Sequence, residues 1–273
     1  MPELTKQYET LCRVISDLGP VAVAFSGGVD SALLLRAAAD ALGAGRVLAV
    51  TAVSSVLPEQ ERREAEEFCA ALGVTRLTVE VPVLALPEFR RNPPDRCYAC
   101  KRLILTQMLA AAAERGFDIL VEGSNLDDDD DYRPGSRAVA ELGVRSPLRD
   151  AGLTKAQIRA IAKQLGLAVW DKPASACLAT RIACGEEITE KKLRAVERAE
   201  QFLKDRGFRQ VRVRVHGRLA RIEVEPEQLD RLLEMRTDAA EYIRSLGFSH
   251  ICMDLEGYRI GSMNPEQGGS YGQ

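Results

Sequence analysis

Short apolar runs alternate with longer segments of helical composition between about residues 20 and 170. Five of these runs have the length of a strand: VAVAF, VLAVTAV, LTVEVPV, ILVEG and LAVW. Strands that are apolar along their whole length are covered by helices on both faces, which is typical of a parallel sheet. The pattern therefore predicts an α/β domain that ends near residue 172.

The pattern changes beyond residue 172. After a segment that contains PASACLATRI, one helical stripe precedes two runs, VRVRV and ARIEVE, which alternate at period two around a turn. Such alternation is typical of half-buried strands in a hairpin. We expect a small α+β domain. The predicted boundaries are 1–172 for the α/β domain, 173–188 for a linker, 189–265 for the small domain and 266–273 for a disordered tail.

Composition and charge exclude several classes of protein. The formal net charge of −3 argues against a surface built mainly for nucleic acid. The chain has no apolar run near the ~18 residues that a membrane span needs, and charged residues interrupt the N-terminal segment where a secretory signal has its apolar core. We therefore expect a cytoplasmic protein without nucleic-acid or membrane partners. Its seven cysteines then serve as thiols, metal ligands or reactive groups rather than as disulfides.

The segment FSGGVDS lies between the first predicted strand and the helix that follows it. Glycines let backbone N–H groups approach an anion closely, and a helix N-terminus adds a favourable partial charge. Ser26 and Ser31 are candidate donors to phosphate, Gly27 and Gly28 form the turn, and Asp30 is a candidate Mg²⁺ ligand. The alternative is a glycine turn in which Asp30 and Ser31 only cap the helix.

The six residues SGGVDS, in this strand–loop–helix context, resemble the PP-loop of the ATP pyrophosphatase superfamily. Its members bind ATP and release pyrophosphate while they attach AMP to a substrate oxygen. A second segment, EGSN, ends the ILVEG strand and resembles the Gly-Thr-Asn segment that these enzymes place near the nucleotide. The resemblance implies that Gly123, Ser124 and Asn125 bind ATP at the same edge of the sheet as the loop.

Four further segments, DYRPG, PASACLATRI, VRVRVHG and ARIEV, resemble one family of that superfamily: the LarE-type ATP-dependent sulfur transferases of nickel-pincer nucleotide synthesis. The resemblance covers nearly the whole chain. It implies that ATP adenylylates a carboxylate of a pyridinium dicarboxylate mononucleotide, and that sulfur from a sulfide donor then displaces AMP to leave a thiocarboxylate. It also implies a homo-oligomer, with a hexamer as one candidate.

The same resemblance implies that Arg212, Arg214 and Glu223 line a pocket for the substrate phosphate. The two arginines stand two apart on one strand and share a face, for which a solvent-exposed face is the alternative. A thiolate requires a local positive field, and Arg181, four residues from Cys177, could supply it. The alternative for Cys177 is a small core residue.

Members of this family are of two kinds. In one kind the cysteine that matches Cys177 gives up its own sulfur, and in the other three cysteines hold a [4Fe-4S] cluster whose remaining iron binds the sulfide that is delivered. The segment CYAC supplies Cys97 and Cys100, so the resemblance implies the second kind, with Cys177 as third ligand. The segment alone leaves zinc, a redox pair and chance open. Cys184 is a candidate substitute ligand.

The remaining features have competing interpretations. Cys12, Cys69 and Cys252 lie in helical or strand patterns, which predict core positions. The run Asp127 to Asp131 is typical of a solvated loop, although one or two of its carboxylates could bind Mg²⁺. Lys101 directly follows CYAC, and we expect a surface lysine there, with pyrophosphate as its alternative partner.

Two rival functions stay open from the sequence. The first is a PP-loop enzyme that thiolates tRNA with a similar three-cysteine cluster, and tight, salt-sensitive tRNA binding would favour it. The second is an adenine-nucleotide sensor, which would release no pyrophosphate with any carboxylate substrate.

Overall fold

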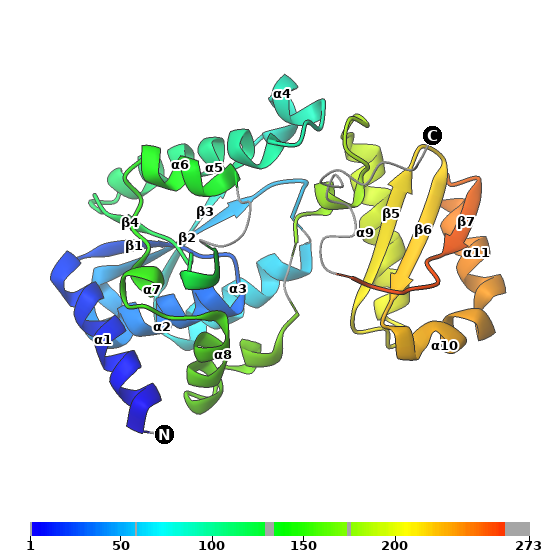
Figure 1. The fold of residues 1–273 in the computed structure, drawn as a ribbon. Coiled ribbons are helices and arrows are strands. Elements are labelled where there is room, and N and C mark those ends of the chain that lie inside the picture. Colours follow the sequence, from blue (N-terminus) through cyan, green and yellow to red (C-terminus); the bar gives the residue numbers. More distant parts are fainter. Residues whose placement is uncertain (1, 58, 129–133, 174–175, 260–273) are drawn as a thin grey trace, which may run out of the picture. The chain divides into compact units, whose positions relative to one another are not determined.

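The computed structural model describes four ranges of the chain: residues 2–57, 59–128, 134–173 and 176–259. The chain forms two compact units (Figure 1): the first has residues 1–83 and 97–175, and the second has residues 84–96 and 176–273. The predicted tail, 266–273, lies outside the described residues. In the described ranges, no helix is long and apolar enough to cross a membrane.

The first unit is built on a four-stranded parallel sheet. Its strands are β1 (Val21–Ala24), β2 (Val47–Val53), β3 (Thr75–Glu80) and β4 (Leu120–Val121), in the order β3-β2-β1-β4. Strand β1 pairs in parallel with both β2 and β4. Nearly every residue of β1 and β2 is buried, because helices cover both faces. The predicted α/β fold with a parallel sheet is confirmed.

The strand order creates a switch point between β1 and β4. The chain runs from β1 outward to β2 and β3, and it returns on the other side of β1 as β4. Right-handed crossovers that run in opposite directions put their helices on opposite faces. Accordingly, α2 (Val29–Leu42) lies on one side of the sheet and α5 (Arg96–Ala113) on the other (Figure 1). The loops after β1 and β4 border the crevice where such sheets bind ligands.

The core of the first unit lies where α2 packs between the sheet and its neighbouring helices. The other helices of this unit are α1 (Pro2–Leu18), α3 (Glu59–Ala71), α6 (Pro134–Glu141), α7 (Pro147–Asp150) and α8 (Lys155–Gln164). Leu11 of α1, Leu34 of α2 and Ile158 of α8 are fully buried in one cluster. Helix α2 is apolar on most sides, as a helix with several packed faces must be.

The run LAVW does not form the predicted strand. Residues Ala168–Asp171 form a 3₁₀ turn instead. Arg159 on α8 donates hydrogen bonds to the carbonyl oxygens of Trp170 (2.7 Å) and Lys172 (2.8 Å), and the ammonium of Lys163 lies 4.3 Å from the centre of the Trp170 ring. Helix α8 therefore satisfies the polar groups of this run, which packs on the helix and not on the sheet.

The second unit contains a three-stranded mixed sheet. Its strands are β5 (Val211–His216), β6 (Leu219–Val224) and β7 (His250–Met253), in the order β5-β6-β7. The predicted hairpin is present, since β5 and β6 are antiparallel, and β7 adds in parallel to β6. The helices are α4 (Pro87–Arg90), α9 (Glu190–Lys204), α10 (Leu229–Glu234) and α11 (Arg236–Ser245). Helices α10 and α11 are consecutive in the chain and are divided at Met235.

Residues 84–96 join the second unit through the side chain of Asn92. Its amide donates hydrogen bonds to the carbonyl oxygens of Ile182 (3.2 Å), Ala183 (2.8 Å) and Glu186 (3.1 Å). Asn92 is fully buried and has a φ of 56°, in the left-handed region that asparagine tolerates better than most residues. This residue therefore fixes the segment that follows Cys177, although nothing in the sequence pattern identified it.

We expect Asn92→Ala to lower the free energy of unfolding by about 3 kcal/mol, because it removes three hydrogen bonds and puts a Cβ-bearing residue without a polar side chain in the left-handed region. Asn92→Gly also removes the hydrogen bonds but adopts this conformation without strain, so its loss is smaller. Urea denaturation of the wild type and the two variants measures both contributions: the loss of the hydrogen bonds, and the strain of alanine in the left-handed region. Equal stability of Asn92→Ala and wild type would contradict this account.

Candidate active site

The loop between β1 and α2 turns at two glycines. Gly27 has a φ of 75°, which favours glycine, and Gly28 is the residue before α2. The Ser31 hydroxyl donates to the carbonyl oxygen of Gly28 (3.1 Å), and the hydroxyl oxygens of Ser26 and Ser31 lie 3.1 Å apart. Within the described residues, no side chain caps this helix. The structure does not support the capping alternative for Asp30 and Ser31, and the helix N-terminus is available to an anion.

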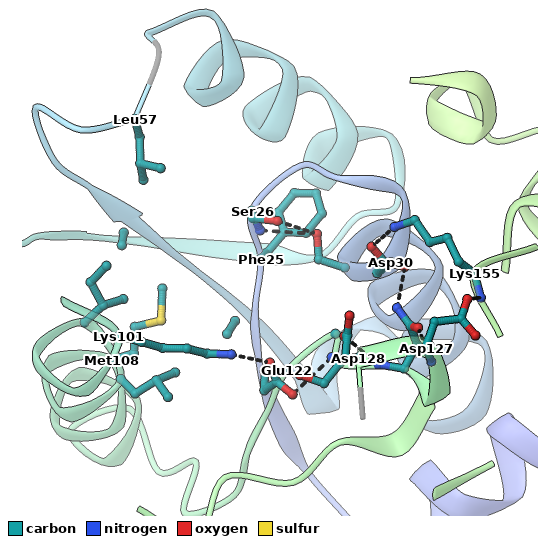
Figure 2. A pocket seen from close by; sticks show the side chains of 18 residues that line it. Phe25, Ser26, Asp30, Leu57, Lys101, Met108, Glu122, Asp127, Asp128 and Lys155 are labelled. Carbon is teal, nitrogen blue, oxygen red and sulfur yellow. Dashed lines mark hydrogen bonds and ion pairs between the residues drawn. The ribbon is translucent and has the colours of Figure 1, made fainter. Parts of the chain in front are cut away.

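This loop forms one wall of a cavity of about 580 Å³ in the first unit (Figure 2). Small-molecule sites commonly have volumes of about 300–1,000 Å³. The polar lining residues are Ser26, Asp30, Ser31, Lys101, Glu122, Ser124, Asn125, Asp127, Asp128 and Lys155. The apolar lining residues are Ala24, Phe25, Ala52, Leu57, Ile104, Leu105 and Met108. A nucleotide likewise has a part that suits apolar residues, the flat base, and a part that suits polar residues, the charged phosphate chain.

The predicted segment Gly123 to Asn125 lies against the glycine loop. A Cβ atom at Gly123 would lie 3.2 Å from both the Cβ of Asp30 and the backbone nitrogen of Ser31, so a larger residue would push the two loops apart. Asn125 is buried, and its amide donates to the carboxylate of Asp30 (3.4 Å). The structure brings the two predicted ATP-binding segments together, while their roles stay predictions.

Sequence reasoning missed Lys155, which lines the cavity and forms an ion pair with Asp30. Lys155 is the first residue of α8, where Thr154 and Gln157 form a capping box. The pattern T-x-x-Q was the available signal, because it places the start of a helix at this point. It does not indicate that the helix begins beside Asp30, which lies 125 residues earlier in the chain.

The first two residues of the acidic run contact the cavity. Asp127 accepts a hydrogen bond from the backbone N–H of Lys155 (2.9 Å), and Asp128 accepts one from the backbone N–H of Asn125 (3.0 Å). These two carboxylates therefore hold the loop after β4, in addition to any contact with solvent. The rest of the run, residues 129–131, lies outside the described residues.

Glu122, at the end of β4, is the most buried acid of the cavity, with 7% of its surface exposed. Its carboxylate accepts hydrogen bonds from the Ser146 hydroxyl (2.7 Å), the Ser124 N–H (3.0 Å) and the Lys101 ammonium (3.1 Å). Burial by itself raises the pKa of Glu122, but Lys101 and the two hydrogen-bond donors outweigh it, and the pKa is lowered. Lys101 is therefore a cavity residue and not the surface lysine that we expected.

The lowered pKa of Glu122 predicts a pH-dependent contribution to stability. The charged form contributes above the ordinary pKa of 4.5, and the contribution is lost as the pH falls through the lower pKa of the folded state. The difference in free energy of unfolding between wild type and Glu122→Gln should thus be constant from about pH 7 to 5 and shrink below. Urea titrations of both proteins from pH 7 to below pH 5 test this prediction. A difference in free energy of unfolding that grows as the pH falls would contradict it.

In the second unit, Arg181 is buried beside Glu200. Its guanidinium donates to both carboxylate oxygens of Glu200, at 2.9 and 3.0 Å, and also to the backbone carbonyl oxygens of Ala176 (2.5 Å) and Cys177 (2.9 Å). Glu200 offsets the charge of Arg181, which weakens the field that Arg181 exerts on its surroundings. The observed contact of Arg181 with Cys177 holds the backbone and not the thiol.

Arg212 and Arg214 are only 6% and 5% exposed, so the solvent-exposed alternative for this strand face is wrong. Arg214 donates two hydrogen bonds to the fully buried Glu223, at 2.8 and 3.0 Å. The guanidinium of Arg212 lies 5.3 Å from the centre of the Tyr258 ring. Burial, and then the charge of Arg181, lowers the pKa of Arg212. The structure brings the three predicted arginines close enough to influence one another.

The candidate cluster ligands are divided between the two units. Cys97 and Cys100 lie in the first turn of α5, in the first unit, and Cys177 lies in the second, before the 3₁₀ turn Leu178–Arg181. Over the described part of the chain, no three His, Cys, Asp or Glu side chains form a group that could hold a metal ion. Cys184, also in the second unit, contacts the carbonyl oxygen of Asn92. The three-cysteine cluster stays a prediction.

The other cysteines differ in their burial. Cys69 is buried, and burial raises the pKa of its thiol to about 11, which makes it a poor nucleophile at neutral pH. Cys12 is half-buried beside α2. Cys252 is exposed on β7, so its predicted core position is wrong. The reason is that side chains alternate between the two faces of β7, and Cys252 lies on the more exposed face together with His250.

The sequence is similar to known proteins over part or nearly all of its length. A family model described as NAD synthase matches residues 14–87, which include the glycine loop. A tRNA-specific 2-thiouridylase of Frankia alni is 32% identical over 57% of this chain and 53% of its own length. An uncharacterised protein of Synechocystis is 39% identical over 96% of this chain and 98% of its own.

A fourth match extends along both units. The pyridinium-3,5-bisthiocarboxylic acid mononucleotide synthase of Lactiplantibacillus plantarum is 36% identical over 97% of this chain and 96% of its own length. The chain therefore belongs to the LarE-type family of ATP-dependent sulfur transferases.

Proposed function

We propose that the protein binds Mg²⁺–ATP in the cavity of the first unit and adenylylates a carboxylate of pyridinium-3,5-biscarboxylic acid mononucleotide, with release of pyrophosphate. Sulfur then displaces AMP and leaves a thiocarboxylate. The observation that carries the proposal is the close approach of Gly123 to Asp30 and Ser31, because it joins both ATP-binding segments at one cavity wall. The end-to-end similarity to a synthase of that product supports the choice of substrate.

The first step needs a site for a departing pyrophosphate. The open N-terminus of α2 and the hydroxyls of Ser26 and Ser31 offer hydrogen bonds to phosphate oxygens. The backbone N–H donors belong to the helix and its loop, so they are in place before the nucleotide binds. The Ser31 hydroxyl has to turn from the carbonyl oxygen of Gly28 to donate to a phosphate oxygen.

Four carboxylates but only two ammonium groups line this cavity among the described residues. A nucleotide adds further negative charge, so a divalent cation is needed to offset it. Asp30, with Asp127 or Asp128 from the loop after β4, has the carboxylate oxygens that Mg²⁺ prefers, and nucleotide phosphates and water would complete the coordination. Bound Mg²⁺ would neutralise the charge that develops on the phosphates. In this assignment Lys155 leaves Asp30 and pairs with a phosphate oxygen.

The substrate phosphate is assigned to the buried arginines of the second unit. Arg181, Arg212 and Arg214 are buried close to one another, and burial together with the charge of Arg181 lowers the pKa of Arg212. Glu200 binds Arg181, and Glu223 binds both Arg214 and Arg221. A substrate phosphate beside Arg212 would favour its charged form and could accept charged hydrogen bonds from these guanidinium groups. Glu223 serves to orient Arg214.

Sulfur delivery is assigned to the cysteines. In the preferred form, Cys97, Cys100 and Cys177 hold a [4Fe-4S] cluster with one iron open to sulfide, which would supply the nucleophile. The alternative is that Cys177 gives up its own sulfur. In both forms Arg181 fixes the backbone of Cys177 through two carbonyl oxygens. A cytoplasmic homo-oligomer completes the proposal.

Pyrophosphate release should depend on the pyridinium mononucleotide and not on tRNA or on ATP alone. Arg212→Ala and Arg214→Ala should each raise the KM for that substrate by about 10- to 100-fold, because each removes a charged hydrogen bond, and leave ATP affinity unchanged. Arg218→Ala, an exposed arginine at the β5–β6 turn, is the matched control. Release stimulated by tRNA would favour the tRNA alternative, and an equal loss of ATP affinity would remove the arginines from the substrate site.

Anaerobic reconstitution tests the cluster. Wild type should acquire iron and acid-labile sulfide in cluster stoichiometry, and Cys177→Ala should lose most of both, because two thiolates hold a cluster poorly. Cys252→Ala, an exposed cysteine on β7, is the control and should match wild type. Wild type without iron or sulfide would leave Cys177 as a sacrificial donor and return Cys97 and Cys100 to a zinc or structural role.

A further inference from the structure

The first turns of α5 carry two chemically different groups on a short stretch of helix. Cys97 and Cys100 are followed directly by Lys101. Residues four apart lie on the same face of a helix, so Cys97 and Lys101 project from one side of α5. Lys101 lines the nucleotide cavity, and in Figure 2 it reaches toward Glu122.

Contacts confine the side chain of Lys101 to this direction. Its ammonium lies 3.1 Å from a carboxylate oxygen of the buried Glu122. Its stem passes close to Gly135 at the start of α6, where a Cβ atom would lie 2.9 Å from the Lys101 Cδ. One turn earlier, Tyr98 donates a hydrogen bond from its hydroxyl to Glu141 of α6 (2.6 Å). The first turns of α5 are thus held between α6 and the cavity.

The charged residues of the cavity indicate which ligand group Lys101 binds when a nucleotide occupies the cavity. Lys101 and Lys155 are the two cations among the described lining residues, and Figure 2 shows that they approach from different sides. Glu122 is buried and also accepts from Ser124 and Ser146. The Lys101 ammonium has three N–H donors, so it can keep its contact with Glu122 and bind a ligand oxygen as well. A phosphate in the cavity is therefore a suitable second partner for the Lys101 ammonium.

We propose that Lys101 is a positioning residue, which binds a phosphate oxygen of the nucleotide and thereby fixes the turn of α5 that carries Cys97 and Cys100. The inference rests on the proposed nucleotide site, and it adds that nucleotide binding is coupled to the order of the first turns of α5. The nucleotide does not merely supply AMP, because its binding also orders the cysteine pair. No bond is made or broken in this step.

Hydrogen–deuterium exchange of the full-length chain measures this coupling. The first N–H groups of a helix have no partner within the helix, so their exchange reports how firmly its first turn is held. With Mg²⁺–ATP, we expect wild type to exchange more slowly at residues 26–31 and also at residues 96–101. In Lys101→Met, protection at 26–31 should remain and protection at 96–101 should be lost. Lys101→Arg should restore the protection of residues 96–101.

Matched controls separate the possible outcomes. Lys163→Met removes an exposed lysine that contacts Trp170 outside the cavity, and it should behave as wild type. Equal protection of residues 96–101 in wild type and Lys101→Met would mean that the nucleotide shields this turn without Lys101, and it would overturn the inference. Absence of protection at residues 26–31 in wild type would instead contradict the proposed nucleotide site itself.

Discussion

The nucleotide site depends on the close packing of two glycine-containing loops at the carboxyl edge of the parallel sheet. Strands β1 and β4 are neighbours, so the loops that follow them leave the sheet side by side. Gly27 supplies the left-handed turn into α2, and Gly123 lets the second loop approach Asp30 and Ser31. This packing leaves the N-terminus of α2 open and brings Asp30, Asn125 and Lys155 to one place.

A different constraint governs the second unit, where charged groups are buried in a small mixed sheet. Glu200 binds Arg181 and also accepts a hydrogen bond from the backbone N–H of Val213 (3.1 Å), so it joins α9 to the edge of β5. Arg214 bridges Glu223 to the carbonyl oxygen of Thr180 (3.3 Å). Buried ion pairs add little net stability, and their usual benefit is a fixed geometry. Here they fix the backbone around Cys177.

Local sequence patterns predicted those structural elements that depend mainly on residues close together in the chain. The buried strands, the glycine loop and the β5–β6 hairpin follow from periodicity and turn residues, because these properties act within a few positions. Contacts between distant segments were not predictable in this way. The pairs Lys155–Asp30 and Lys101–Glu122 join residues 125 and 21 positions apart. Periodicity by itself also left the burial of Arg212 open, because period two reveals a shared face but not what covers it.

The central claim is that ATP activates a substrate carboxylate through a bond to AMP, and oxygen transfer tests it most directly. The pyridinium dicarboxylate mononucleotide, labelled with ¹⁸O in its carboxylates, would be turned over with ATP and a sulfide donor, and the AMP analysed by mass spectrometry. Attack of a carboxylate oxygen on the α-phosphorus, followed by cleavage of the carbon–oxygen bond by sulfur, predicts one ¹⁸O atom in each AMP. Thiocarboxylate formation with unlabelled AMP would contradict the account.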